Sequence, residues 1–195
     1  GDAVVTSRGA YPTFNYHVAA CGGELTAVPF RADHHEDLEG LAEAAWAERP
    51  KLVYLSNPDN PMGTWHPASA VAAFHASLPP DATLLVDEAY VELAPPGTAL
   101  PPELPADGSL VRLRTFSKAH GLAGLRIGYL VAAGGTIQSL DKIRQHFGVN
   151  SVAQAGALAS LRDEEHLRRV VAEVQRGREE YYRLGEEVGA PAVRS

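Results

Sequence analysis

The sequence is poor in the residues that cross-linked or metal-stabilised proteins use. Its 195 residues include a single cysteine, Cys21, so it has neither a disulfide framework nor a cysteine-based metal site. His34 and His35 are adjacent at the start of a helical pattern and point in different directions, so we expect no metal site from them. The apolar runs are too short to span a membrane. These features favour a reducing compartment, and we expect a cytoplasmic protein.

Positive charge is also scarce. Lysine and arginine together number 17 against 24 aspartates and glutamates, which gives a net charge of −7. A chain with this balance has no general electrostatic attraction to nucleic acids or anionic membranes, and we expect neither as a partner. If the protein binds a phosphate group, a local pocket must hold it.

Short apolar runs alternate with amphipathic stretches in the first part of the chain. The runs are rich in Val, Leu and Tyr and predict strands that are buried on both faces. The stretches 37–48 and 67–78 have apolar residues at helical spacing, and the proline-rich stretch 94–108 predicts a surface loop. The alternation predicts an α/β fold with a mainly parallel sheet flanked by helices, which binds ligands at the carboxyl ends of its strands. The predicted strands are DAVVTS (2–7), ELTAVPF (24–30), KLVYLSN (51–57), TLLVDEAY (83–90), LVRLRTFS (110–117) and RIGYLVAA (126–133).

The pattern then changes from strands to helices. Asn150 or Ser151 is placed to cap one helix, and Asp163 with the following glutamates begins a longer, charged helix. We therefore expect an incomplete large domain over residues 1–148. Residues 149–195 are expected to form connecting helices and the truncated start of a small domain.

A proline-rich motif, SNPDNPMGTW (56–65), directly follows a predicted strand. Each proline fixes its own φ and restricts the residue before it, so the motif predicts a rigid, non-helical turn. It is either a plain surface turn or a preset loop that directs Asn60 into a site at the end of the strand.

An acidic motif, LLVDEAYVEL (84–93), places Asp87 directly after apolar strand residues. A carboxylate at this point is costly to bury unless a cation pairs with it. Asp87 is either an acidic strand end that caps a local backbone group or a functional carboxylate, with Tyr90 close behind it in the sequence.

The stretch TFSKAHGLAGLRIGY (115–129) places hydroxyls and cations among glycines and small apolar residues. Thr115, Ser117 and Arg126 can hold a phosphate through their hydroxyls and a fork-shaped guanidinium. Lys118 loses its proton more readily beside other cations, which suits an amine nucleophile. Taken alone, the same stretch is also compatible with a solvated lysine and arginine on a loop.

The order and spacing of these motifs resemble the signature of fold type I pyridoxal-phosphate aminotransferases. NPDNPMG, DEAY and SKAHGLAGLRIGY follow one another as in class I and II, and they are similar to the histidinol-phosphate aminotransferase branch. The resemblance covers nearly all of the chain. It implies pyridoxal 5′-phosphate as cofactor, an amino donor and a 2-oxo acid as substrates, and a homodimer.

The resemblance also implies roles for single residues in the reaction. Lys118 is similar to the lysine that holds the cofactor covalently and transfers the substrate proton. Asp87 stands where the family has an aspartate that keeps the pyridine nitrogen protonated. Asn60 and Tyr90 resemble the pair that hydrogen-bonds to the phenolic oxygen of the ring. On the same ground, the Asn60–Pro61 bond is expected to be cis.

The remaining residues implied by the resemblance bind the cofactor without taking part in proton transfer. Thr115, Ser117 and Arg126 match the phosphate-binding residues, and an arginine offers phosphate a bidentate contact that a lysine does not. Tyr11, in SRGAYPTF, stands where the family places an aromatic ring against the pyridine face.

Parts of the family's length lie outside this sequence, which begins at Gly1. We expect these parts to include an N-terminal arm, a first strand, and most of the small domain with the arginine that binds the substrate carboxylate. The isolated chain is therefore expected to be inactive. Two alternatives stay open, namely a pyridoxal-phosphate-dependent decarboxylase of the threonine-phosphate type and a truncated scaffold that turns over no substrate.

Overall fold

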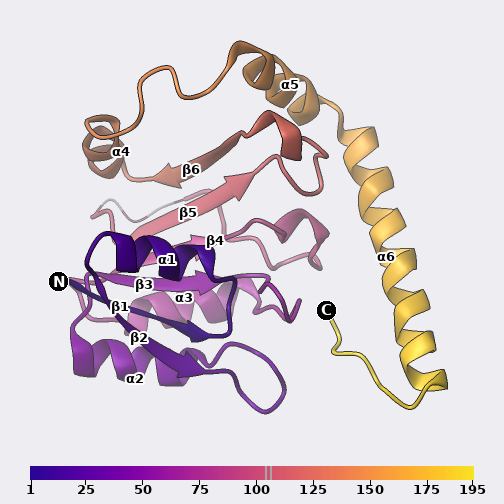
Figure 1. Cartoon of the computed structure of the whole chain (residues 1–195), viewed down its shortest axis with the longest axis horizontal. Coiled ribbons are helices and arrows are strands. Elements are labelled where there is room, and N and C mark those ends of the chain that lie inside the picture. The colour runs from indigo at the N-terminus through magenta and orange to yellow at the C-terminus, as the bar shows by residue number, and fades with distance from the viewer. Residues whose placement is uncertain (104, 106) are drawn as a thin grey trace.

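A single mixed sheet organises the chain (Figure 1). The computed structural model describes all residues except 104 and 106, and in this part six strands pair in the order β2-β1-β3-β4-β5-β6. Neighbouring strands from β2 to β5 are parallel, whereas β6 is antiparallel to β5. The predicted α/β fold with a mainly parallel sheet is therefore confirmed. The strands are β1 Ala3–Arg8, β2 Glu24–Pro29, β3 Leu52–Ser56, β4 Thr83–Asp87, β5 Leu110–Thr115 and β6 Gly128–Ala132.

The helices that cover the sheet agree in part with the sequence pattern. Both predicted amphipathic helices form, as α2 and α3. Asp37, Asn150 and Asp163 cap α2, α5 and α6 by accepting a backbone N–H of the first turn. The sequence did not predict α1 and α4, because each spans only 8 residues and shows no clear apolar period. The helices are α1 Thr13–Ala20, α2 Leu38–Glu48, α3 Ala68–Ser77, α4 Gly134–Asp141, α5 Ser151–Arg162 and α6 Glu164–Glu187.

The two outer strands differ from the prediction that every strand is buried on both faces. All residues of β2 and β6 are partly or largely exposed, whereas most of β3 is buried. Each outer strand pairs on one side only, and apolar composition alone does not distinguish such a strand from a central one.

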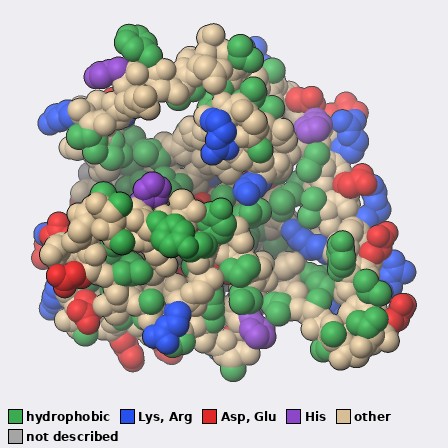
Figure 2. Space-filling model, in the orientation of Figure 1, with side chains coloured by type: hydrophobic (Ala, Val, Ile, Leu, Met, Phe, Trp, Pro, Cys, Tyr) green, Lys and Arg blue, Asp and Glu red, His purple; other side chains and the backbone are tan. Residues whose placement is uncertain are grey.

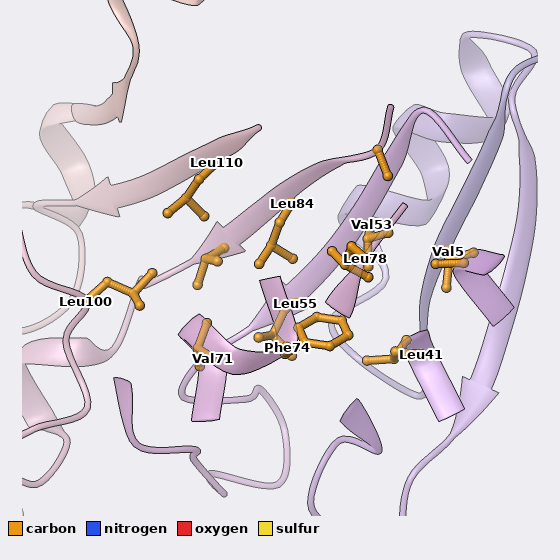
Figure 3. Close-up of a cluster of buried hydrophobic side chains, with 13 residues drawn as sticks. Val5, Leu41, Val53, Leu55, Val71, Phe74, Leu78, Leu84, Leu100 and Leu110 are labelled. Atoms are coloured by element: carbon orange, nitrogen blue, oxygen red, sulfur yellow. The ribbon is translucent and has the colours of Figure 1, made fainter. Parts of the chain in front are cut away.

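Side chains alternate across the central strands and divide the sheet into an apolar and a polar face. On one face, residues of β3 and β4 pack against α2 and α3 in the main hydrophobic core (Figure 3). The intervening residues Tyr54, Ser56 and Asp87 point to the opposite face, where they line a cavity. The core residues that these two strands supply are Val53, Leu55, Leu84 and Val86.

The proline-rich stretch 94–108 is not wholly a surface loop. Thr98 and Leu100 are buried, and Leu100 belongs to the main core. The prediction was wrong for these residues because a loop rich in proline can still pack an apolar side chain against the sheet. Residues 104 and 106 of this stretch lie outside the described part.

Helix α6 runs along one edge of the molecule, where acidic and basic side chains lie side by side (Figure 2). It is tied to the short 3₁₀ helix η1 (Val91–Leu93) by Arg178, whose Nη2 donates to the carbonyl of Leu93 at 2.7 Å. None of the helices that the structure describes combines the length and apolar character needed to cross a bilayer. The domain boundary at residue 148 stays a prediction.

A buried ion-pair network joins β5 to the segment after β4. Glu88 is 1% exposed, and its Oε2 accepts from Nε of Arg112 at 2.9 Å and from Nη1 of Arg114 at 3.2 Å. Arg114 also donates to Oε1 of Glu92 at 2.9 Å. A buried carboxylate is tolerated here because two guanidinium groups balance its charge.

We expect Glu88→Gln to lower the free energy of unfolding by about 3 kcal/mol or more, because it leaves buried guanidinium groups without their counter-charge. Urea titration followed by circular dichroism measures this change. The control is Glu173→Gln, which removes the exposed partner of Arg176 on α6 and should cost about 0.5 kcal/mol or less. Equal losses in the two variants would contradict the expected importance of the buried network.

Candidate active site

A cavity of about 530 Å³ lies at the carboxyl ends of β3, β4 and β5. Parallel α/β sheets bind ligands at this edge. All of the site residues predicted from the sequence line it, although their individual roles stay predictions. These residues are Tyr11, Asn60, Asp87, Tyr90, Thr115, Ser117, Lys118 and Arg126. The sequence did not single out the other lining residues, which are Tyr54, Ser56, Ala89, Leu113, Arg114 and Ala123.

The loop after β3 is closed by its own side chain and backbone groups. The buried side chain of Asn57 donates to the carbonyl of His66 at 3.0 Å and accepts its backbone N–H at 2.8 Å. The Asn60–Pro61 bond is cis as expected, and Asn57–Pro58 is cis as well. Gly63 has a φ of +73°, which residues with a Cβ rarely adopt. The hydrogen bonds of Asn57 close the loop, and Asn60 within it lies at the cavity wall.

Residues from all three motifs meet at one wall of the cavity. Nδ2 of Asn60 donates to the phenolic oxygen of Tyr90 at 3.2 Å. Nζ of Lys118 lies 4.9 Å from the centroid of the Tyr90 ring, within the range of a cation–π contact. The wall therefore presents an amide, a phenol and an amine close together.

The carboxylate of Asp87 has a donor on each oxygen. The backbone N–H of Ala89 donates to Oδ1 at 3.0 Å, and the phenol of Tyr54 donates to Oδ2 at 2.8 Å. Asp87 is half-buried and is held by these neutral donors, and its pairing with a cation stays a prediction. Tyr54 could have been noticed in the sequence, because it lies two residues before Ser56. Residues two apart in a strand point to the same face, which here is the polar face of β3.

The end of β5 and the segment after it supply hydroxyls and a guanidinium. Oγ1 of Thr115 accepts the backbone N–H of Ser117 at 3.1 Å, and Nη1 of Arg126 donates to the carbonyl of Ala123 at 2.8 Å. Arg126 has a φ of +54°, a left-handed conformation that costs a residue with a Cβ about 1–2 kcal/mol. Arg126 has this backbone conformation while its guanidinium lies at the cavity.

Tyr11 lies before α1 at the rim of the cavity, with 54% of its surface exposed. A partly exposed aromatic ring at such a rim is suited to stacking on a flat ligand. Its position agrees with the sequence expectation, and its contact with a cofactor stays a prediction.

The family model for aminotransferase class I and II matches residues 1–193. The chain belongs to the class I and II aminotransferases. Histidinol-phosphate aminotransferase 2 of Ralstonia nicotianae is 42% identical over 177 residues, which cover 87% of this chain and 45% of that relative. The aromatic amino acid aminotransferase of Corynebacterium diphtheriae is 39% identical over 195 residues, which cover 97% of this chain and 55% of the relative. The chain spans about half the length of the curated relatives it matches.

Solved structures agree with the fold of this chain. Histidinol-phosphate aminotransferase from Sinorhizobium meliloti, crystallised with pyridoxal-5'-phosphate, matches 99% of this chain and 53% of its own, with a TM-score of 0.94 and 48% identity. L-threonine-O-3-phosphate decarboxylase from Porphyromonas gingivalis matches 95% of this chain and 56% of its own, with a TM-score of 0.81 and 22% identity. The latter similarity shows a shared fold.

A buried glutamate next to the cavity was missed by the sequence reasoning. Glu36 is 2% exposed, and its Oε2 accepts from Oγ of Ser7 at 2.6 Å while its Oε1 accepts the backbone N–H of Ser56 at 3.1 Å. It therefore joins the carboxyl ends of β1 and β3. Acidic residues are common just before helices, so nothing in the sequence indicates that Glu36 is buried.

Burial raises the pKa of Glu36 to about 8, and the charge of nearby Asp59 adds to this rise, while the hydrogen bond from Ser7 opposes it. The folded chain thus binds this proton more tightly than the unfolded chain, where the pKa has its ordinary value of 4.5. Glu36 therefore stabilises the fold most fully below pH 4.5, and this stabilisation is lost as the pH rises through about 8.

We expect Glu36→Gln to remove this pH dependence, because an amide keeps a donor and an acceptor for Ser7 and Ser56 without ionising. The free energy of unfolding of the variant minus that of wild type should rise by about 1.4 kcal/mol per pH unit between about pH 5 and about pH 8. Urea titrations across this range test it. Glu39→Gln, on the exposed side of α2, is the control and should give a constant difference. Parallel curves for wild type and Glu36→Gln would mean that Glu36 is ionised in the fold.

Proposed function

We propose that the full-length protein is a pyridoxal-phosphate-dependent aminotransferase. It exchanges an amino group between an amino acid, or an amino-phosphate such as histidinol phosphate, and a 2-oxo acid. The observation that carries this proposal is the convergence of Asp87, Lys118 and Arg126, with their neighbouring hydroxyl and amide groups, on one cavity. The names of the relatives from Ralstonia nicotianae and Sinorhizobium meliloti support the choice of substrate. The homodimer stays a prediction from the family resemblance.

The polar groups around the cavity suit each part of pyridoxal phosphate. Asp87 offers an acceptor for a protonated ring nitrogen, and Asn60 with Tyr90 offers an amide and a phenol for the ring oxygen. The crystallised relative from Sinorhizobium meliloti contains this cofactor. The hydroxyl and guanidinium groups for the phosphate come from Thr115, Ser117 and Arg126.

The residues of this chain have different roles in the proposed reaction. When bound, pyridoxal phosphate supplies a ring that takes up electrons from the carbon beside the substrate amino group. Lys118 provides the amine that removes the proton from that carbon and holds it for return. Asp87 would offer its carboxylate to the ring nitrogen, and Tyr11 would stack on one face of the ring.

We expect the full-length protein to carry pyridoxal phosphate on Lys118. Borohydride reduction of the protein with bound cofactor, followed by peptide mapping, should leave the cofactor mass on the peptide that contains this lysine. The other lysines serve as internal controls. A label on Lys51 or Lys142 would exclude the proposed role of Lys118.

In the full-length protein, Asp87→Asn should reduce kcat far more than it weakens cofactor binding. The phosphate-binding groups and Tyr11 are unchanged in this variant, whereas the charge that stabilises a protonated ring nitrogen is lost. This loss acts on the transition state, so kcat should fall on the order of a hundredfold or more. Steady-state kinetics with saturating cofactor measure it.

A variant that turned over within about threefold of wild type would show that Asp87 does not pair with the ring nitrogen. The same assays identify the reaction, because formation of a new amino acid from the 2-oxo acid indicates transamination. Release of carbon dioxide from a phosphorylated amino acid would instead support the decarboxylase, and an absence of cofactor binding would support the inactive scaffold.

A further inference from the structure

Asp87 is oriented by a side chain that has no role in the function described above. We infer that Tyr54 is a positioning residue for the reaction, because its phenol fixes the orientation of the carboxylate that faces the ring nitrogen. The inference rests on the proposed function and adds to it a residue that touches Asp87 rather than substrate or cofactor.

The strand register brings Tyr54 to Asp87. Ser56 of β3 lies directly beside Asp87 of β4, and Tyr54 lies beside Leu85. Since side chains on one face of a strand recur every second residue, Tyr54 is the diagonal neighbour of Asp87 on the polar face. A tyrosine is long enough to span this diagonal, and its hydroxyl oxygen lies 2.8 Å from Oδ2.

Packing holds the Tyr54 ring in this direction. Tyr54 is 5% exposed, and its ring stacks on Phe14 of α1 with centroids 4.1 Å apart and planes inclined by 12°. Burial and the negative charge of Asp87 both raise the pKa of the Tyr54 hydroxyl, so the phenol stays protonated and donates. The donor is therefore fixed in place and in protonation state.

The two donors to Asp87 approach from different elements. The backbone N–H of Ala89 holds Oδ1 from the segment after β4, and the Tyr54 hydroxyl holds Oδ2 from β3. With both contacts the carboxylate has one orientation relative to the cavity. With the Ala89 contact alone it can rotate about its Cβ–Cγ bond, and the oxygen facing the ring nitrogen is then no longer fixed.

A simpler explanation is that a buried tyrosine needs some partner for its hydroxyl, and that Asp87 happens to be near. The two explanations differ in what removal of the hydroxyl does. A tyrosine with only a structural role affects stability, and its effect on the reaction does not depend on the residue at position 87. A positioning residue acts on the reaction through Asp87 and has no such effect once the carboxylate is gone.

The test uses Tyr54→Phe in the full-length protein with bound pyridoxal phosphate. This variant keeps the ring and its stacking on Phe14 and removes one oxygen. We expect kcat to fall about tenfold while KM stays within about twofold, because the loss appears in the transition state. The NMR chemical shift of the isotope-labelled ring nitrogen of bound pyridoxal phosphate should also move. The control Tyr16→Phe removes a hydroxyl from a side chain that is 68% exposed on α1, and it should leave kcat and the chemical shift unchanged.

A double-mutant cycle with Asp87→Asn decides between the two explanations. In the Asp87→Asn background, Tyr54→Phe should change kcat by less than about twofold, since the two residues act as one unit. An equal fall in both backgrounds, or an unchanged chemical shift in Tyr54→Phe, would overturn the inference. Failure of the proposed function is a separate result, because it requires that wild type binds no pyridoxal phosphate or that Asp87→Asn alone has no effect.

Discussion

The pairing of β3 with β4 determines which side chains of the central sheet enter the core and which line the cavity. Ser56 lies beside Asp87, and the two-residue period of each strand then determines every other orientation nearby. Leu55 and Val86 point into the core with α2 and α3, while the polar residues line the cavity. A slip of one residue would exchange these faces, placing Asp87 in the core and apolar side chains in the cavity.

Two adjacent carboxylates at the end of β4 show how the two faces differ. Asp87 lines the cavity and is bound by neutral donors, whereas Glu88 is buried and pairs with Arg112 and Arg114. Two guanidinium groups balance the charge of Glu88, whereas the donors to Asp87 are uncharged. Arg114 contacts Glu88 and also lines the cavity, so the same guanidinium belongs to both environments.

The sequence predicted the residues of the candidate site better than the network that supports them. Motif order predicted Asn60, Asp87 and Lys118, which line one cavity, and alternation of apolar runs with helical patterns predicted the sheet. Both signals can be read along the sequence without knowledge of which strands pair. Glu36 and Tyr54 were missed, since their importance arises from pairing with strands distant in the sequence. The exposure of β2 and the burial of Leu100 were missed for the same reason, because they depend on what packs alongside.

The loop after β3 has a consequence for the energetics of ligand binding. Asn57 satisfies both backbone groups of His66, so the intervening turn is closed by contacts that form when the chain folds. The conformational entropy of Asn60 is therefore reduced during folding rather than when a ligand arrives. A ligand that bound at this wall of the cavity would therefore require little further ordering of the loop, and more of its contact energy would be retained as affinity.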